Sequence, residues 1–136
     1  MALENYSPSN SRSQLIEKGS NKFILDAYNA NPSSMKAAIE NFAKMEGNKK
    51  VLLLGGMMEL GTESITEHQS IINVIDNYKW QAVVLVGGDY HKLKHQYINL
   101  ENSLQAKDWF NKQQFENTQV LGSTTQIISL IFFNEL

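Results

Sequence analysis

Residues 51–56 read VLLLGG, and this stretch decides the fold class. Four apolar residues followed by two glycines are typical of a parallel strand that is covered on both faces and ends in a tight turn. The pattern recurs at residues 82–88, AVVLVGG. Between them, apolar residues repeat at helical spacing over 71–78, after Ser64 and Glu67, which are spaced as a capping box. The sequence therefore predicts a strand–helix–strand unit.

The same alternation extends towards the N-terminus. Turn-type residues at 18–21 separate a short run at 14–17 from FILDA at 23–27, which indicates two strands joined by a tight turn. Asn31 and Pro32 then provide an N-cap and a first helical residue. The apolar stripe that follows predicts a helix; it consists of Met35, Ala38, Ile39, Phe42 and Met45.

Towards the C-terminus the units are weaker but in the same order. They are a strand at 97–100, a helix around residues 106–110, a strand at 118–121 and a buried last helix at 127–133. Alternation of this kind predicts an α/β fold: an open, doubly wound, mostly parallel sheet with helices on both faces.

Composition excludes several classes of function. The 136 residues carry a net charge of −2, which leaves no broad basic surface for nucleic acid. There is no cysteine, so disulfide frameworks and thiolate metal sites are excluded. No apolar run approaches the roughly 20 residues that span a bilayer, and the N-terminus lacks a basic-then-apolar targeting pattern, so we expect no membrane contact and a cytoplasmic protein.

Common catalytic and phosphate-binding motifs are absent from the chain. It contains no G-x-x-x-x-G-K-[ST], G-x-G-x-x-G, G-x-S-x-G or H-E-x-x-H. His91 and His95 have i, i+4 spacing but no carboxylate at ligand spacing, which favours a solvated surface over zinc. We therefore expect no metal site and no catalytic residue within this domain alone.

Ligands of open parallel sheets bind outside the carboxyl ends of the strands. That rule selects four segments: 26–31, 55–61, 87–91 and 122–125. The first of them, DAYNAN, places a carboxylate and two carboxamides between a strand end and a helix start. A carboxylate could accept from ribose hydroxyls and an amide could donate to a phosphate. Turn and cap chemistry explains the same residue types without any ligand, and the spacing alone does not separate the two interpretations.

Two strings carry a resemblance to a known family. DAYNANPSSM at 26–35 and LGGMMELGTESITEH at 54–68 resemble, in this order, segments of the C-terminal domain of Mur ligases. The branch they resemble adds D-Ala-D-Ala to UDP-N-acetylmuramoyl-tripeptide in peptidoglycan synthesis. The resemblance is strong from about Arg12 to Gly88 and weaker beyond.

The resemblance implies a longer, three-domain enzyme. Residues 1–12 would be a linker from a missing central domain, and residues 13–136 the C-terminal domain. The missing domain would hold most of the ATP and Mg²⁺. The tripeptide carboxylate would be phosphorylated, and the amine of D-Ala-D-Ala would attack the acyl phosphate. This chain would then be a half-site, inactive alone, whose partners are the two substrates and its own N-terminal and central domains.

The resemblance also implies roles for particular residues. Arg12 would lie against the nucleotide, Asp26 would hold its ribose hydroxyls, and Asn29 would face its terminal phosphate. The substrate-binding residues would be Asn31, Glu59, His68 and Ser123. Asn31 has an alternative role as a helix cap, and His68 as a partly buried, hydrogen-bonded histidine on the apolar stripe.

The chain departs from the family pattern at two places. The family's LGDM reads Leu-Gly-Gly-Met here, so glycine replaces aspartate at position 56. The family's Lys-Gly-Ser-Arg reads LGST at 121–124, without either basic residue. Loss of such charges weakens anion binding. The departures keep open an alternative function as a stand-alone, catalytically inactive binding or regulatory domain.

Overall fold

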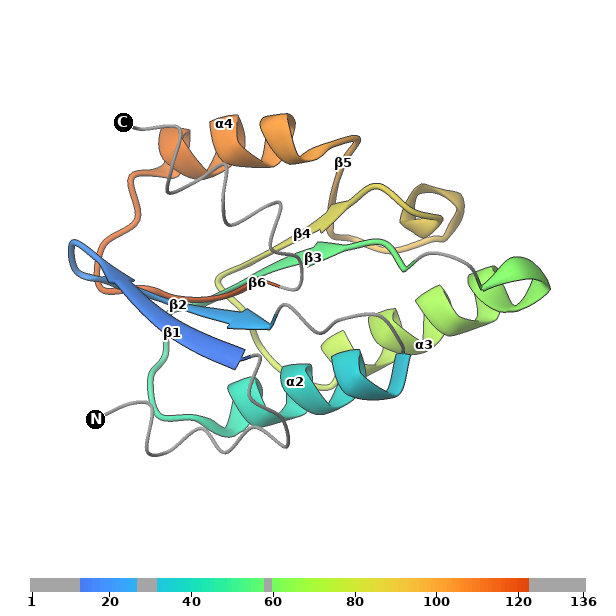
Figure 1. The fold of residues 1–136 in the computed structure, drawn as a ribbon, viewed down its shortest axis with the longest axis horizontal. Helices are drawn as coiled ribbons and strands as arrows, with labels where there is room; N and C mark the ends of the chain where they lie inside the picture. Colours follow the sequence, from blue (N-terminus) through green and yellow to red (C-terminus); the bar gives the residue numbers. More distant parts are fainter. Residues whose placement is uncertain (1–12, 27–31, 58–59, 123–136) are drawn as a thin grey trace.

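The computed structural model describes residues 13–26, 32–57 and 60–122, which form one sheet with helices on both faces (Figure 1). The sheet has the strand order β1-β2-β6-β3-β4-β5. Its strands are β1 (Ser13–Lys18), β2 (Asn21–Asp26), β3 (Lys50–Gly55), β4 (Ala82–Val86), β5 (Ile98–Leu100) and β6 (Gln119–Gly122). The helices are α2 (Pro32–Lys44), α3 (Ser64–Ile75) and α4 (Ser103–Gln113), with short 3-10 turns η1 (Gly61–Glu63) and η2 (Tyr90–Lys92).

The pairing of the strands confirms the predicted fold class. β1 and β2 form the predicted hairpin and pair antiparallel. All other neighbours in the sheet pair parallel. Helices α2 and α3 lie on one face and α4 on the other (Figure 1), which is the arrangement that right-handed crossovers produce.

The central strand β3 explains why VLLLGG has no polar position. Its residues alternate between two apolar clusters, one on each face of the sheet. Leu52 and Leu54 pack in the cluster that includes Ile39 of α2 and Ile72 of α3. Val51 and Leu53 pack in the other, which includes Phe110 of α4. The side chains of residues 51–54 are completely buried.

Lys50, the first residue of β3, is buried as well, with 6% of its surface exposed. Its ammonium donates to the carbonyl oxygens of Ala43, at 2.9 Å, and Met45. These carbonyls belong to the C-terminal end of α2, where the helix leaves acceptors unpaired and favours a cation. Burial lowers the pKa of this amine. Lys50 thus closes the end of α2 against the sheet.

Several predicted boundaries need correction. Helix α2 begins at Pro32 as predicted, but the capping box at Ser64 is wrong. The N-cap of α3 is Glu63, without a side-chain bond, because the preceding turn η1 runs directly into the helix. The strand predicted at 118–121 starts one residue later, at Gln119, and the predicted helix at 127–133 lies outside the described residues. Over the part that is described, no helix is long and apolar enough to cross a membrane.

Candidate functional site

The strand ends at which the four selected segments begin lie on one edge of the sheet. Leu25 of β2 is paired with Gly122 of β6, and Gly122 with Leu53 of β3. Gly55 of β3 is paired with Val86 of β4. Because these strands run parallel, their carboxyl ends meet at the same edge, here named the carboxyl edge. The four strand ends selected from the sequence therefore lie together at the level of the backbone.

Most residues predicted to bind ligands fall outside the described part of the chain. Arg12, Asn29, Asn31, Glu59 and Ser123 all lie there. Asp26 is the last residue of β2, at the carboxyl edge, and its backbone alone is described. Their roles stay predictions. The described residues instead show the part of the edge between β3 and β4 in detail.

Two glycines bring the ends of β3 and β4 into direct backbone contact. The Gly56 amide donates to the Val86 carbonyl at 2.9 Å, which continues the ladder past the end of β3. A Cβ atom at Gly56 would lie 2.3 Å from the Gly88 Cα and 2.6 Å from the Gly88 nitrogen. Gly88 also has a φ of +60°, a conformation that favours glycine. Here the family's aspartate has no room at position 56 unless the β4 turn moves.

His68 lies behind this contact, on the first turns of α3, and is completely buried. Its Nε2 accepts from the Met57 amide at 3.1 Å. Its Nδ1 lies 2.7 Å from the Ser64 carbonyl oxygen and 3.2 Å from Ser64 Oγ. The ring packs edge-on against Tyr90, with centroids 4.7 Å apart. These contacts favour the second interpretation of His68, a buried and hydrogen-bonded histidine.

Ser64 links α3 to the turn after β4. Its hydroxyl donates to the Asp89 carboxylate at 2.5 Å, and Asp89 also forms an ion pair with Lys92 at 3.2 Å. The Ser64 hydrogen bond, and then Lys92, lower the pKa of Asp89. Asp89 bonds to the serine and not to the histidine, so the three side chains do not form the order of a nucleophilic triad. Instead, the Ser64–Asp89 bond connects the start of α3 to the turn after β4.

Sequence reasoning did not identify the contacts that Ser64, Asp89 and Gly88 make at this edge. It selected the segment 87–91 only because a strand end lies there, and assigned Ser64 to a helix cap. Tyr90, in the same segment, is fully buried, and its hydroxyl lies 3.7 Å from Met35 Sδ of α2. Burial raises the pKa of Tyr90 strongly. No local pattern marks Tyr90 as buried, because its sequence neighbours are Asp89 and His91 and its contact Met35 lies 55 residues earlier.

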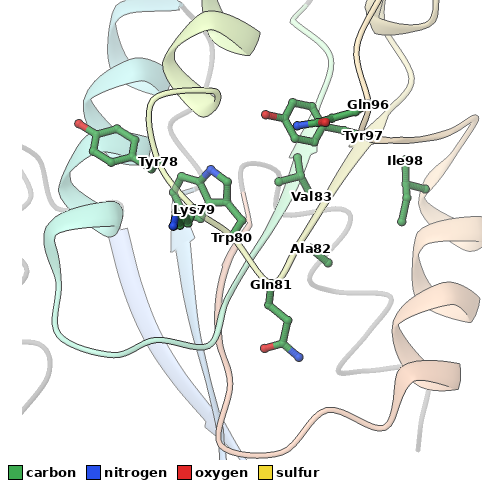
Figure 2. A pocket seen from close by; sticks show the side chains of 9 residues that line it. All are labelled: Tyr78, Lys79, Trp80, Gln81, Ala82, Val83, Gln96, Tyr97 and Ile98. Carbon is green, nitrogen blue, oxygen red and sulfur yellow. The ribbon is translucent and has the colours of Figure 1, made fainter.

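A cavity lies at the opposite, amino edge of the sheet. It has a volume of about 560 Å³ and is bounded by the residues before and at the starts of β4 and β5 (Figure 2). Tyr78, Trp80 and Tyr97 supply aromatic rings to its wall, and Gln81 and Gln96 are among its polar lining residues. Trp80 stacks on Phe42 of α2 and donates its indole N–H to the Ile75 carbonyl. His68, whose side chain is described, does not line this cavity.

Comparison with known proteins identifies the family of this chain. A sequence model of the family described as "Mur ligase, glutamate ligase domain" matches residues 11–131. This chain belongs to the Mur ligase family. The Mur ligase domain is 32% identical, over 125 residues, to UDP-N-acetylmuramoyl-tripeptide--D-alanyl-D-alanine ligase of Rickettsia prowazekii (strain Madrid E). That match covers 92% of this chain and 25% of the relative.

A second relative matches the region of the two motifs. The ligase of the same name from Bacillus subtilis (strain 168) is 45% identical over 78 residues, 56% of this chain and 17% of the relative. The Mur ligase domain thus spans a quarter or less of the length of these relatives.

Solved structures share the fold of the Mur ligase domain. MurF ligase from Thermotoga maritima in complex with ADP superposes with a TM-score of 0.74 at 18% identity, over 88% of this chain and 30% of that one. MurF from Acinetobacter baumannii gives a TM-score of 0.68 at 22% identity, over 92% of this chain and 30% of that one. At these identities the likeness concerns the fold alone.

Proposed function

We propose that this Mur ligase domain is the C-terminal part of an ATP-dependent peptide ligase that adds D-Ala-D-Ala to UDP-N-acetylmuramoyl-tripeptide in the cytoplasm. The observation that carries the proposal is the position of the two family strings. The strings at 26–35 and 54–68 begin at the carboxyl ends of the parallel strands β2 and β3, which end at Asp26 and Gly55. The names of the relatives from R. prowazekii and B. subtilis support the choice of substrates.

The donor set at the carboxyl edge fits a supporting role in nucleotide binding. Among the described residues no group of three or more His, Cys, Asp or Glu could hold a metal ion. The Asp89 carboxylate near β4 is already held by Ser64 and Lys92. As the resemblance to Mur ligases implies, we assign the triphosphate and Mg²⁺ mainly to a separate central domain. In T. maritima MurF the nucleotide found is ADP.

The proposed contribution of this domain is binding and orientation. Arg12 and Asn29 would neutralise and hold phosphate oxygens, and Asp26 would accept from the ribose hydroxyls. Asn31, Glu59 and Ser123 would orient the incoming dipeptide, with Glu59 receiving its ammonium. Bound ATP supplies the phosphoryl group that activates the tripeptide carboxylate. Residues 1–12 would be the hinge and 13–136 the domain that it carries.

The direct test is phosphate release from ATP in the presence of Mg²⁺, UDP-linked tripeptide and D-Ala-D-Ala. The protein from the full reading frame should release phosphate only when the dipeptide is present. The 136-residue chain alone should release none. Turnover by this chain alone contradicts the interpretation of the chain as a half-site that is inactive by itself. A full-length protein without dipeptide-dependent release favours the inactive binding domain instead.

A pair of matched variants tests the nucleotide contact in the full-length protein. Asp26→Asn removes the carboxylate at the end of β2 and should raise the KM for ATP by at least about tenfold, as expected when a charged hydrogen bond worth about 1.5–3 kcal/mol is lost. Glu46→Gln removes an exposed carboxylate after α2 and should leave that KM unchanged. Equal KM values for both variants contradict the role of Asp26.

A further inference from the structure

The hydrogen bonds of His68 fix the protonation of its ring. The Met57 amide can only donate, so Nε2, at 3.1 Å, must be the unprotonated acceptor. The Ser64 carbonyl oxygen can only accept, so Nδ1, at 2.7 Å, must carry the proton. Ser64 Oγ gives its own proton to Asp89 and leaves a lone pair facing Nδ1. His68 is therefore a neutral imidazole in the Nδ1–H form, and both ring nitrogens are occupied.

The same ring joins the two loops at the carboxyl edge. It holds the first residue after Gly56 through the Met57 amide. It contacts the turn after β4 through Tyr90, and a Cβ atom at Gly88 would lie 3.0 Å from its Nε2. The pair Ser64–Asp89 makes a second connection between α3 and that turn. The end of β3, the start of α3 and the turn after β4 are thus packed as one unit.

We propose that His68 is a positioning residue for the dipeptide site, which it serves through the Met57 amide and not through contact with substrate. Met57 is the last residue described before Glu59 in the sequence, and its amide donates to the His68 ring. This inference rests on the proposed function, because Glu59 is there the residue that receives the dipeptide ammonium. It replaces direct substrate binding by His68 with an indirect role.

Two substitutions test the roles of the two ring nitrogens one at a time. In His68→Gln the side-chain oxygen replaces Nε2 and can still accept from the Met57 amide. In His68→Asn the side-chain amide replaces Nδ1, keeps the bond to the Ser64 carbonyl and leaves the Met57 amide unpaired. In the full-length protein, His68→Asn should raise the KM for D-Ala-D-Ala about tenfold, within the range for an unsatisfied buried donor. His68→Gln should stay within about twofold of the wild type.

His95 provides the matched control. Its Nδ1 accepts from the Tyr97 amide at 3.0 Å and its Nε2 lies 3.2 Å from the Tyr90 carbonyl. His95→Gln therefore removes an acceptor from a backbone amide in the same way, but that amide belongs to Tyr97, in the wall of the cavity at the amino edge. It should leave the KM for D-Ala-D-Ala unchanged. The KM for ATP should not change in any of the three variants.

The outcomes divide clearly. An equal rise in KM for His68→Asn and His68→Gln indicates contact with substrate and overturns the proposal. A lower melting temperature in His68→Asn with an unchanged KM for the dipeptide overturns it as well. An independent measurement is the ¹⁵N chemical shifts of the His68 ring in the 136-residue chain: Nδ1–H supports the proposal and Nε2–H overturns it. If the full-length wild type does not ligate D-Ala-D-Ala, the proposed function fails, whereas the ring assignment is still tested.

Discussion

The two edges of the sheet use their side chains in opposite ways. At the carboxyl edge, the polar groups of Ser64, His68 and Asp89 bond to one another or to backbone, and Gly56 touches Gly88. At the amino edge, aromatic rings surround a cavity of about 560 Å³ (Figure 2). A cavity alone would direct attention to the amino edge. The topology and the family strings direct it to the carboxyl edge, so the two criteria select opposite edges of the same sheet.

The largest effect should come from the glycine contact at the carboxyl edge. Gly56→Ala places a Cβ against the Gly88 backbone, which cannot rotate away as a side chain would. We expect a loss of about 3 kcal/mol in the free energy of unfolding, measured by urea denaturation. Gly61→Ala is the control, because its Cβ would meet nothing within 4 Å and only its φ of +58° is strained, at a cost of about 1 kcal/mol. Equal losses would refute the contact.

The second effect tests whether the amino edge serves stability alone. Trp80→Ala removes the stacking on Phe42, 6.0 Å between centroids, and the bond to the Ile75 carbonyl. The half-buried ring should contribute about 2–3 kcal/mol to the free energy of unfolding. Trp80→Phe keeps a ring on Phe42 and should lose about 1 kcal/mol. In the full-length protein neither variant should change the KM for D-Ala-D-Ala. A change in this KM would contradict the view that the amino edge serves stability alone.

A smaller effect concerns Tyr97, in the wall of the cavity. Burial, and then the hydrogen bond to Asp76, raise the pKa of Tyr97 to about 12. An unfolded tyrosine ionises near pH 10, so the stability that comes from the neutral phenol is present below pH 10 and is lost as the pH rises towards 12. Ultraviolet titration of the phenolate should give this midpoint, and Asp76→Asn should lower it in part. A ligand that covers the cavity would raise it further.

The smallest effect concerns Asp89 at the carboxyl edge. Its pKa is lowered from 3.8 by the Ser64 hydroxyl and then by Lys92. The link between Asp89 and α3 should therefore be intact above about pH 4 and be lost as the pH falls through the lowered pKa. An NMR titration of the Asp89 carboxyl should show a midpoint below 3.8 that rises in Ser64→Ala. Lys92→Met should raise it less, because that ammonium is more exposed.

The strands could be predicted from the sequence because each carries its own signal. VLLLGG has no polar position since β3 is covered on both faces, and the strand-end glycines mark the turns at the carboxyl edge. Pro32 at the start of α2 is equally local. The predicted convergence of the four segments needed only the rule that parallel strands end on the same side.

The details of the site could not be predicted, because they depend on residues far apart in the chain. Ser64 has the spacing of a cap, yet its hydroxyl bonds to Asp89, 25 residues later. The missing aspartate at position 56 resembles a lost binding group, whereas Gly88, 32 positions away in sequence, leaves no space for it. Neither partner is visible in a local pattern.

The sequence by itself determined the α/β architecture, the edge at which the parallel strands end and the membership of the Mur ligase family, because these depend on periodicity, strand-end glycines and two contiguous strings. Only the tertiary structure decided how the edge is held. It placed the Met57 amide and the Ser64 carbonyl on either side of the His68 ring, which fixes one tautomer. Hydrogen bonds require distances near 3 Å, and packing brings these groups from separate elements within that reach.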